Sequence, residues 1–213
     1  MFQKLLTSFV LMSFSLLTLT SVFGLPQRPL RDVPSRELVR YLYTDDLAQE
    51  AIIEIHDRMN MVAVKGIDED RELVTALMET LDSKNVQVKV EAVITLSLAR
   101  DNMVRKRILR LLGSERDNRV RTAVVASVAR ISGGWPTDER DIENIKSIVL
   151  EGSESIDGDS WLKGNAIYAL GAVGAITALK ELRQHEGIRR AYGHVIDNAL
   201  ERAREVKEKA PDQ

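Results

Sequence analysis

The chain has 213 residues, of which 44% are hydrophobic, 29% are charged and only 5% are aromatic. Its formal net charge of −2 provides no bulk attraction for nucleic acid or for an anionic membrane surface. It contains no cysteine, which excludes disulfides, thiol catalysis and a lipid attached to a cysteine. The size and composition suit one globular core or one short array of repeats.

The N-terminal segment is predicted to be a secretory signal peptide. Lys4 is its only charged residue, and residues 5–23 are mostly Leu, Phe, Val, Met, Ser and Thr. A cut after Gly24 would have small or modest residues at its −3 and −1 positions. The alternative is a retained anchor, because the apolar run is near the length that spans a bilayer. We therefore expect residues 1–24 to be a signal peptide or anchor, followed by a linker over 25–34.

Five amphipathic helices are predicted along the rest of the chain. Their apolar residues recur three and four positions apart, as at Leu73, Leu77 and Leu81. The five helices span residues 37–43, 70–81, 104–112, 138–149 and 176–182. Turn-forming residues such as Gly113-Ser114 come after them, and no segment alternates as a strand.

A second helix is predicted after each of these, and its start has a repeated pattern. An apolar residue precedes a basic one, and small or apolar residues come next at spacings of three and four. The copies begin at Val88-Lys89, Val120-Arg121, Leu162-Lys163 and Ile188-Arg189, after a degenerate copy at Leu47-Ala48 that lacks the basic residue. The repeating unit is therefore a helical hairpin.

The pattern Val-Arg/Lys-x-x-Ala-x-x-Ala-Leu resembles the second helix of HEAT repeats, particularly the short HEAT-like repeats of bacterial proteins. The resemblance covers most of residues 35–205. It implies an all-α fold, an α-α superhelix (solenoid) of about five HEAT-like helical hairpins. We place this domain at residues 35–207, with a solvated tail over 208–213. The motif is specific for a fold and says little about activity.

The resemblance also implies a role for the basic residue of the pattern. In the family it faces an acidic residue in a turn of the same repeat or the next one. Here Glu115 lies six residues before Arg121, and Asp82 lies seven before Lys89. We expect these basic residues to orient the repeats, with contact to a ligand as the alternative.

The sequence contains no motif that predicts a catalytic or metal-binding site. The three histidines lack the spacing of metal ligands, and no Gly-x-Ser-x-Gly or phosphate-binding glycine loop occurs. HEAT-repeat hydroxylases bind iron through several His-Glu pairs, whereas this chain has only His185-Glu186. We therefore expect no catalytic residue, cofactor or metal, and a chain that is not an enzyme. An enzyme or lyase-type HEAT-like protein acting on a small ligand is the alternative.

Charge is distributed in bands along the chain. Residues 100–130 carry a net +6, whereas residues 66–82 carry −5 and residues 137–160 carry −6. The bands either neutralise one another between neighbouring repeats or leave a basic surface for an acidic partner. The basic residues predicted to contact such a partner are Arg105, Lys106, Arg110 and Arg121.

The two tryptophans are candidate binding anchors. Trp135 lies in a Gly-Gly-Trp-Pro segment between the third and fourth hairpins, and Trp161 begins the second helix of the fourth. A tryptophan in a loop is often a binding anchor, and equally often seals a junction between repeats.

These observations favour an exported scaffold, periplasmic or extracellular, that mediates protein–protein interaction through a groove formed by its second helices. The expected partner is a protein or peptide, with an acidic one favoured by the basic band, and no nucleic acid is expected. A membrane is involved only if residues 5–23 are retained as an anchor, which would make the chain a membrane-tethered assembly factor.

Overall fold

The computed structural model describes residues 30–44, 47–130, 135, 137–151 and 160–209. The chain divides into two units, Met1–Val33 and Pro34–Gln213. Residues 30–33 of the first unit form a turn in which the N–H of Val33 donates to the carbonyl of Leu30 at 3.2 Å. The described helices lie in the second unit, and no strand occurs among the described residues. The predicted signal peptide falls outside them.

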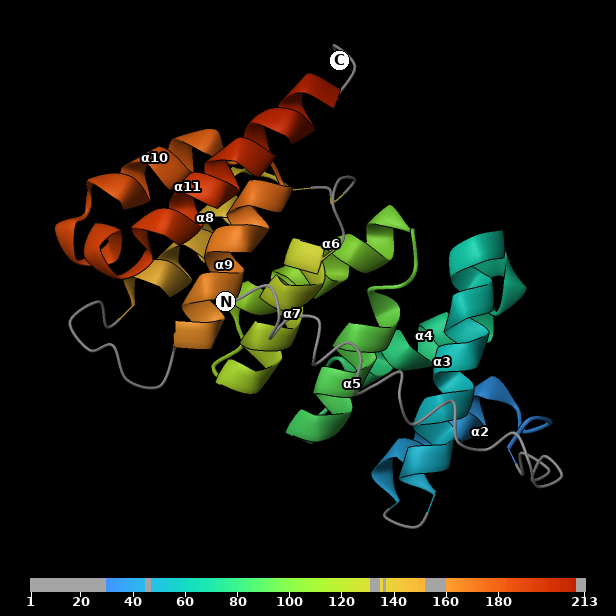
Figure 1. Ribbon diagram of the computed structural model, residues 1–213. Coiled ribbons are helices and arrows are strands. Elements are labelled where there is room, and N and C mark those ends of the chain that lie inside the picture. The colour runs from blue at the N-terminus through green and yellow to red at the C-terminus, as the bar shows by residue number, and fades with distance from the viewer. Residues whose placement is uncertain (1–29, 45–46, 131–134, 136, 152–159, 210–213) are drawn as a thin grey trace, which may run out of the picture. The chain divides into compact units, whose positions relative to one another are not determined.

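The first helix of each hairpin lies in one layer of the second unit (Figure 1). These helices are α2 (Ser35–Arg40), α4 (Arg71–Thr80), α6 (Asn102–Arg110), α8 (Glu139–Leu150) and α10 (Ile176–Gln184). Three short 3-10 helices accompany them, η1 (Tyr41–Tyr43), η2 (Ile67–Glu69) and η3 (Leu111–Gly113). Within this layer α2 packs on α4, and α8 packs on η3 and on α10. The predicted positions of the first helices are confirmed to within a few residues.

The second helices form the other layer, in chain order. They are α3 (Ala48–Lys65), α5 (Val86–Leu96), α7 (Asn118–Arg130), α9 (Ser160–Ala172) and α11 (Glu186–Lys209). Each packs against the next, so that α5 lies between α3 and α7, and α9 lies between α7 and α11. This succession of five hairpins in two layers is an all-α solenoid, as the repeat pattern predicts.

Polar residues at the turns fix where several of these helices begin. The side chains of Asp70, Asn85 and Asp101 each accept a hydrogen bond from the backbone N–H three residues later. Asp138 does the same before α8, and its own backbone N–H donates to the side chain of Asp141, which completes a capping box. Such caps satisfy backbone donors that the first turn of a helix leaves without a partner.

Small residues set how closely the second helices approach. A Cβ added at Gly171 would lie 2.8 Å from the carbonyl oxygen of Ala199, so α9 and α11 touch through their backbones there. Gly171 lies in the last turn of α9, and Gly174 comes shortly after the end of the helix. Gly174 has φ of +75°, a left-handed conformation that favours glycine after a helix.

Candidate partner-binding surface

Two of the basic residues that begin second helices pair with an acidic residue of the next repeat. Nζ of Lys89, on α5, lies 2.6 Å from Oε2 of Glu115, in the turn before α7. Nη2 of Arg121, on α7, lies 2.8 Å from Oε1 of Glu151, at the end of α8. In both cases the acidic residue belongs to the hairpin that comes next, so these pairs connect consecutive repeats. Arg121 is buried, so its side chain is engaged within the array.

The environment of Glu115 stabilises its charged form. Burial acts to raise the pKa of this carboxyl group, but hydrogen bonds from Lys89 and from the backbone N–H groups of Asp117 and Arg116 outweigh it. The pKa of Glu115 is therefore lowered.

The basic band also pairs with the acidic bands on either side of it. Nζ of Lys106 lies 2.5 Å from Asp138 and 2.7 Å from Asp141, both in the fourth hairpin. Arg107 reaches back to Asp82 of the second hairpin at 2.5 Å. The hydrogen bonds that Lys106 donates to Asp138 and Asp141 raise its pKa. For these residues the charge bands neutralise one another between repeats.

Arg105 and Trp135 lie together in the interior. Trp135 is only 6% exposed and Arg105 only 7% exposed. The guanidinium carbon of Arg105 lies 5.6 Å from the centre of the Trp135 ring, a cation–π contact. Burial lowers the pKa of Arg105. Trp135 is therefore buried against α6 of the third hairpin, which favours the second of the two roles considered for it.

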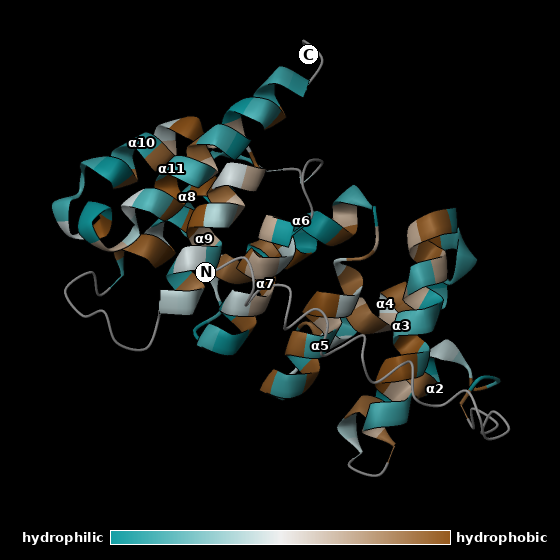
Figure 2. Cartoon of the chain, in the orientation of Figure 1, coloured by the Kyte–Doolittle hydropathy of each residue, from teal (hydrophilic) through white to brown (hydrophobic). Residues whose placement is uncertain are grey.

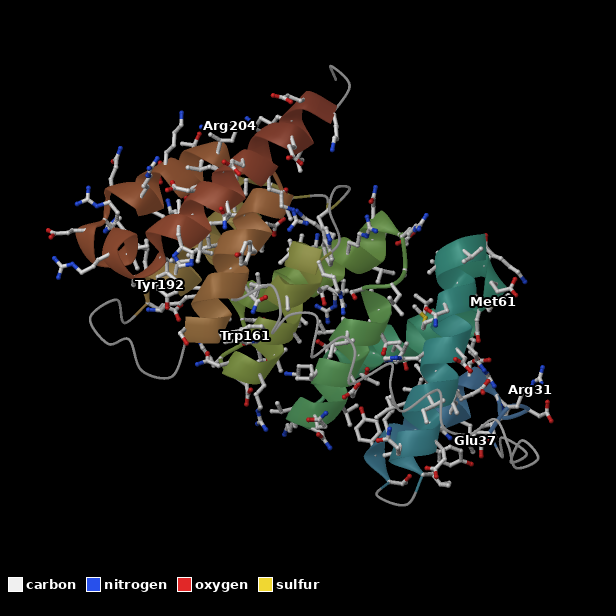
Figure 3. All side chains as sticks on the ribbon, in the orientation of Figure 1. Arg31, Glu37, Met61, Trp161, Tyr192 and Arg204 are labelled. Carbon is white, nitrogen blue, oxygen red and sulfur yellow. The ribbon has the colours of Figure 1, made fainter. Side chains whose placement is uncertain are left out.

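Two of the predicted contact residues remain accessible. Arg110 is exposed near the end of α6. Trp161, in the first turn of α9, is 61% exposed and is visible at that position in Figure 3. The role of the six predicted residues in binding stays a prediction. Arg110 and Trp161 are exposed, and Lys106 is half-buried, with 26% of its side chain exposed.

The second helices also present a surface that sequence patterns alone did not single out. On α5, α7 and α9, residues spaced three and four apart are half-buried or exposed, whereas the positions between them are buried. We call this surface the second-layer face, and it comprises Val90, Glu91, Ile94, Thr122, Ala126, Arg130, Trp161, Asn165 and Tyr168. In the sequence, the apolar residues of this face have the same spacing as core residues. Only their half-burial in the structure distinguishes them from the core.

Charged residues of α5 and α7 influence His56 on α3. The charges of Glu91 on α5 and of Arg130 on α7 both act on His56 of α3. Arg130 also extends toward α5, where its Nη2 lies 3.4 Å from Oγ of Ser97. Burial lowers the pKa of His56, and the charge of Arg130 acts in the same direction against that of Glu91. Neutral His56 therefore borders the second-layer face at its α3 end.

A side-chain hydrogen bond reaches the backbone of the exposed tryptophan at the start of α9. Nδ2 of Asn165 donates to the backbone carbonyl of Trp161 at 2.8 Å, within the helix. Tyr168 lies one turn further along the same side of α9 and is half-buried. The face therefore ends in two neighbouring aromatic side chains with an amide between them, a set able to contact an apolar side chain and hydrogen-bond a peptide group.

Among the residues that the structure describes, no group of three or more His, Cys, Asp or Glu side chains is placed to hold a metal ion. The described helices also include none that is both long and apolar enough to cross a membrane. His185 and Glu186 are both exposed, at the junction of α10 and α11.

No protein-family model matches the sequence, and no curated protein matches it. Among solved structures, an engineered protein from a structural genomics consortium is 17% identical, with a TM-score of 0.49 over 80% of this chain and 79% of that one. A second engineered protein from the same source is 21% identical, with a TM-score of 0.49 over 80% of this chain and 81% of that one. A designed armadillo repeat protein in complex with the peptide (KR)4 is 16% identical, with a TM-score of 0.45 over 78% of this chain and 81% of that one. These likenesses are distant, and the fold described above rests on the helices of this chain alone.

Proposed function

We propose that the chain is a non-enzymatic scaffold that binds a protein or peptide partner on its second-layer face. The observation that supports this most is the exposure of Trp161 on α9, together with half-buried side chains on α5, α7 and α9, which are neighbouring helices. Tryptophan and tyrosine are enriched among the residues that dominate binding energy, and they cluster where surrounding contacts exclude water.

The composition of the face suits an extended or helical polypeptide. Ile94 and Ala126 provide apolar area between Trp161 and the α3 end, while Glu91 and Arg130 provide charges of opposite sign. Apolar contacts would supply affinity, and the two charges would set the orientation of the partner. A partner with an acidic segment is part of the proposal, with exposed Arg130 as its basic contact on this face, while Arg110, on α6 of the first layer, stays a separate prediction.

The test is photo-cross-linking in the native cell. A photoreactive residue placed at Thr122 or Asn165, both on the second-layer face, is expected to capture a partner. The same residue at Thr177 or Lys180, both exposed on α10 in the first layer, serves as the matched control. Equal capture from the two layers, or capture from α10 alone, would contradict the proposal.

We also propose that the scaffold is exported, with residues 1–24 removed. The support is the apolar run of residues 5–23 and the small residue at position 24. N-terminal sequencing of the protein from its native cell is expected to begin at Leu25. A start at residue 1 would favour the membrane-tethered alternative.

A further inference from the structure

A row of large apolar side chains is exposed on α3, the first helix of the second layer. Ile53 is 45% exposed, Met61 44% and Val64 83%. At about 100° per residue these positions fall within roughly a quarter of the helix circumference. The opposite side of α3 is buried in the array, through residues such as Ile55 and Met59. We call the exposed row the α3 edge; Figure 3 labels Met61 on it.

The α3 edge belongs to the helix at one end of the second layer. Each of α5, α7 and α9 has a second-layer neighbour on both sides, whereas α3 packs on α5 alone in this layer, among the residues described. The last hairpin differs. Apart from Gly187 and Ala191, the exposed positions of α11 are polar or charged, among them Arg190, Asp197 and Arg204. Figure 2 shows this contrast, with hydrophobic residues along α3 and a mostly hydrophilic α11.

Terminal repeats of a solenoid need a polar outer side, because the stacking interactions that cover inner repeats are missing there. The outer side of α11 meets this need and the α3 edge does not. Because only one end of the array carries such an apolar row, the row would bind the same row of another molecule. The polar outer side of α11 offers no apolar surface for it. Such a contact joins like to like and closes at two copies.

The charges on α3 specify how two copies would pair. Glu50 lies near the start of the helix and Lys65 at its end, both exposed and roughly 22 Å apart along the axis. In an antiparallel pair that places Ile53 opposite Val64, Glu50 of each copy lies within roughly 3 Å, along the helix axis, of Lys65 of the other. A parallel pair would instead place Glu50 beside Glu50 and Lys65 beside Lys65.

The side chain of Lys65 also pairs with Glu69 of its own chain at 2.7 Å, in a contact that is open to solvent.

We propose that the α3 edge is a homodimer interface in which α3 packs antiparallel against α3 of a second copy. One helix from each copy makes a small contact, so the dimer belongs to the weak class whose population depends on concentration. This proposal does not depend on the partner-binding role of the second-layer face, which lies on other helices.

The test is sedimentation velocity of the purified full-length protein over a range of concentrations. The wild-type mass is expected to rise from one to two copies, and Val64→Glu is expected to weaken association by about tenfold or more. Because Val64 is exposed, this substitution leaves the core intact, which circular dichroism checks. Thr177→Glu on α10 is the matched control and is expected to dimerise as wild type does. A wild-type protein that stays monomeric at every concentration, or a Val64→Glu variant that dimerises normally, would overturn the proposal.

A charge exchange tests the antiparallel geometry. Glu50→Lys alone is expected to weaken the dimer several-fold, because it brings a second positive charge opposite Lys65 of the other copy. Glu50→Lys combined with Lys65→Glu is expected to restore most of the loss. Failure of the double variant to recover any affinity would contradict the antiparallel pairing of α3.

Discussion

Nζ of Lys89 lies 2.6 Å from Oε2 of Glu115, and the two residues belong to consecutive hairpins. Both side chains are largely shielded from water, with exposed fractions of 16% and 13%. Removing one partner of a shielded ion pair lowers the stability of the fold, because the charge of the other partner stays desolvated and unpaired. The pair therefore couples the second and third repeats, and acid should weaken this coupling.

The first prediction concerns the pH dependence of stability. Because the pKa of Glu115 is lowered in the folded state, its contribution is present above the ordinary value of about 4.3 and is lost as the pH falls through the folded value. Glu115→Gln is expected to lower the free energy of unfolding by about 1–3 kcal/mol at pH 7 and to flatten its decline below about pH 4.5. Urea titrations at a series of pH values measure this.

The matched control is Glu201→Gln, which removes an exposed carboxylate from α11. Its unfolding curves are expected to match those of the wild type. If the free energy of unfolding falls equally with pH in Glu115→Gln and in the wild type, the pair of Lys89 and Glu115 does not couple the second and third repeats.

The second prediction concerns two glycines of α9. Gly171→Ala is expected to lower the free energy of unfolding by about 1–3 kcal/mol, because its Cβ would press on the backbone of Ala199. Gly164→Ala, in the same helix, has nothing within 4 Å of the added Cβ and is expected to stabilise by about 0.5–1 kcal/mol. Denaturant unfolding of both variants checks this. Equal effects at the two positions would show that α9 and α11 are not in such close contact.

The third prediction separates the two tryptophans. With Trp161→Phe, the remaining emission comes from buried Trp135 and is expected to be blue-shifted and poorly quenched by acrylamide. With Trp135→Phe, the remaining emission comes from exposed Trp161 and is expected to be red-shifted and readily quenched. Similar quenching in the two variants would contradict the placement of Trp135 beside Arg105.

The fourth prediction concerns His56. Burial lowers its pKa in the folded state, so the unfolded chain binds more protons as the pH falls below about 6.5. Stability is therefore expected to decline from about pH 6.5 downward, and His56→Gln should reduce this decline, whereas exposed His194→Gln should not. Proton NMR titration of the ring measures the pKa directly, and a value at or above 6.5 would refute the prediction.

Much of the architecture could be predicted from spacing. Apolar residues three and four apart place the helices, and polar turn residues such as Asp70 and Asp101 mark their starts. The small residues of α7 and α9 indicate close packing between neighbours. These are local properties, so a single chain carries them without further information.

The surface was harder to predict, because exposure depends on contacts between distant residues. Arg105 and Arg121 have the composition of a binding band, yet the first packs on Trp135 and the second pairs with Glu151. Conversely, Ile94 and Tyr168 have the helical period of the core but lie at its open side. An apolar residue that faces the other layer and one that faces solvent can occur at the same helical spacing. The sequence pattern alone therefore does not distinguish them.

The most direct test of the central claim is the cross-link formed from Asn165 in the native cell, compared with and without Trp161→Ala. Asn165 lies one turn from Trp161 on the second-layer face, so a partner anchored there should be captured. Loss of the tryptophan is expected to reduce the captured partner by about tenfold, with folding unchanged by circular dichroism. Undiminished capture in the Trp161→Ala chain, or no capture in either chain, would contradict binding at this face.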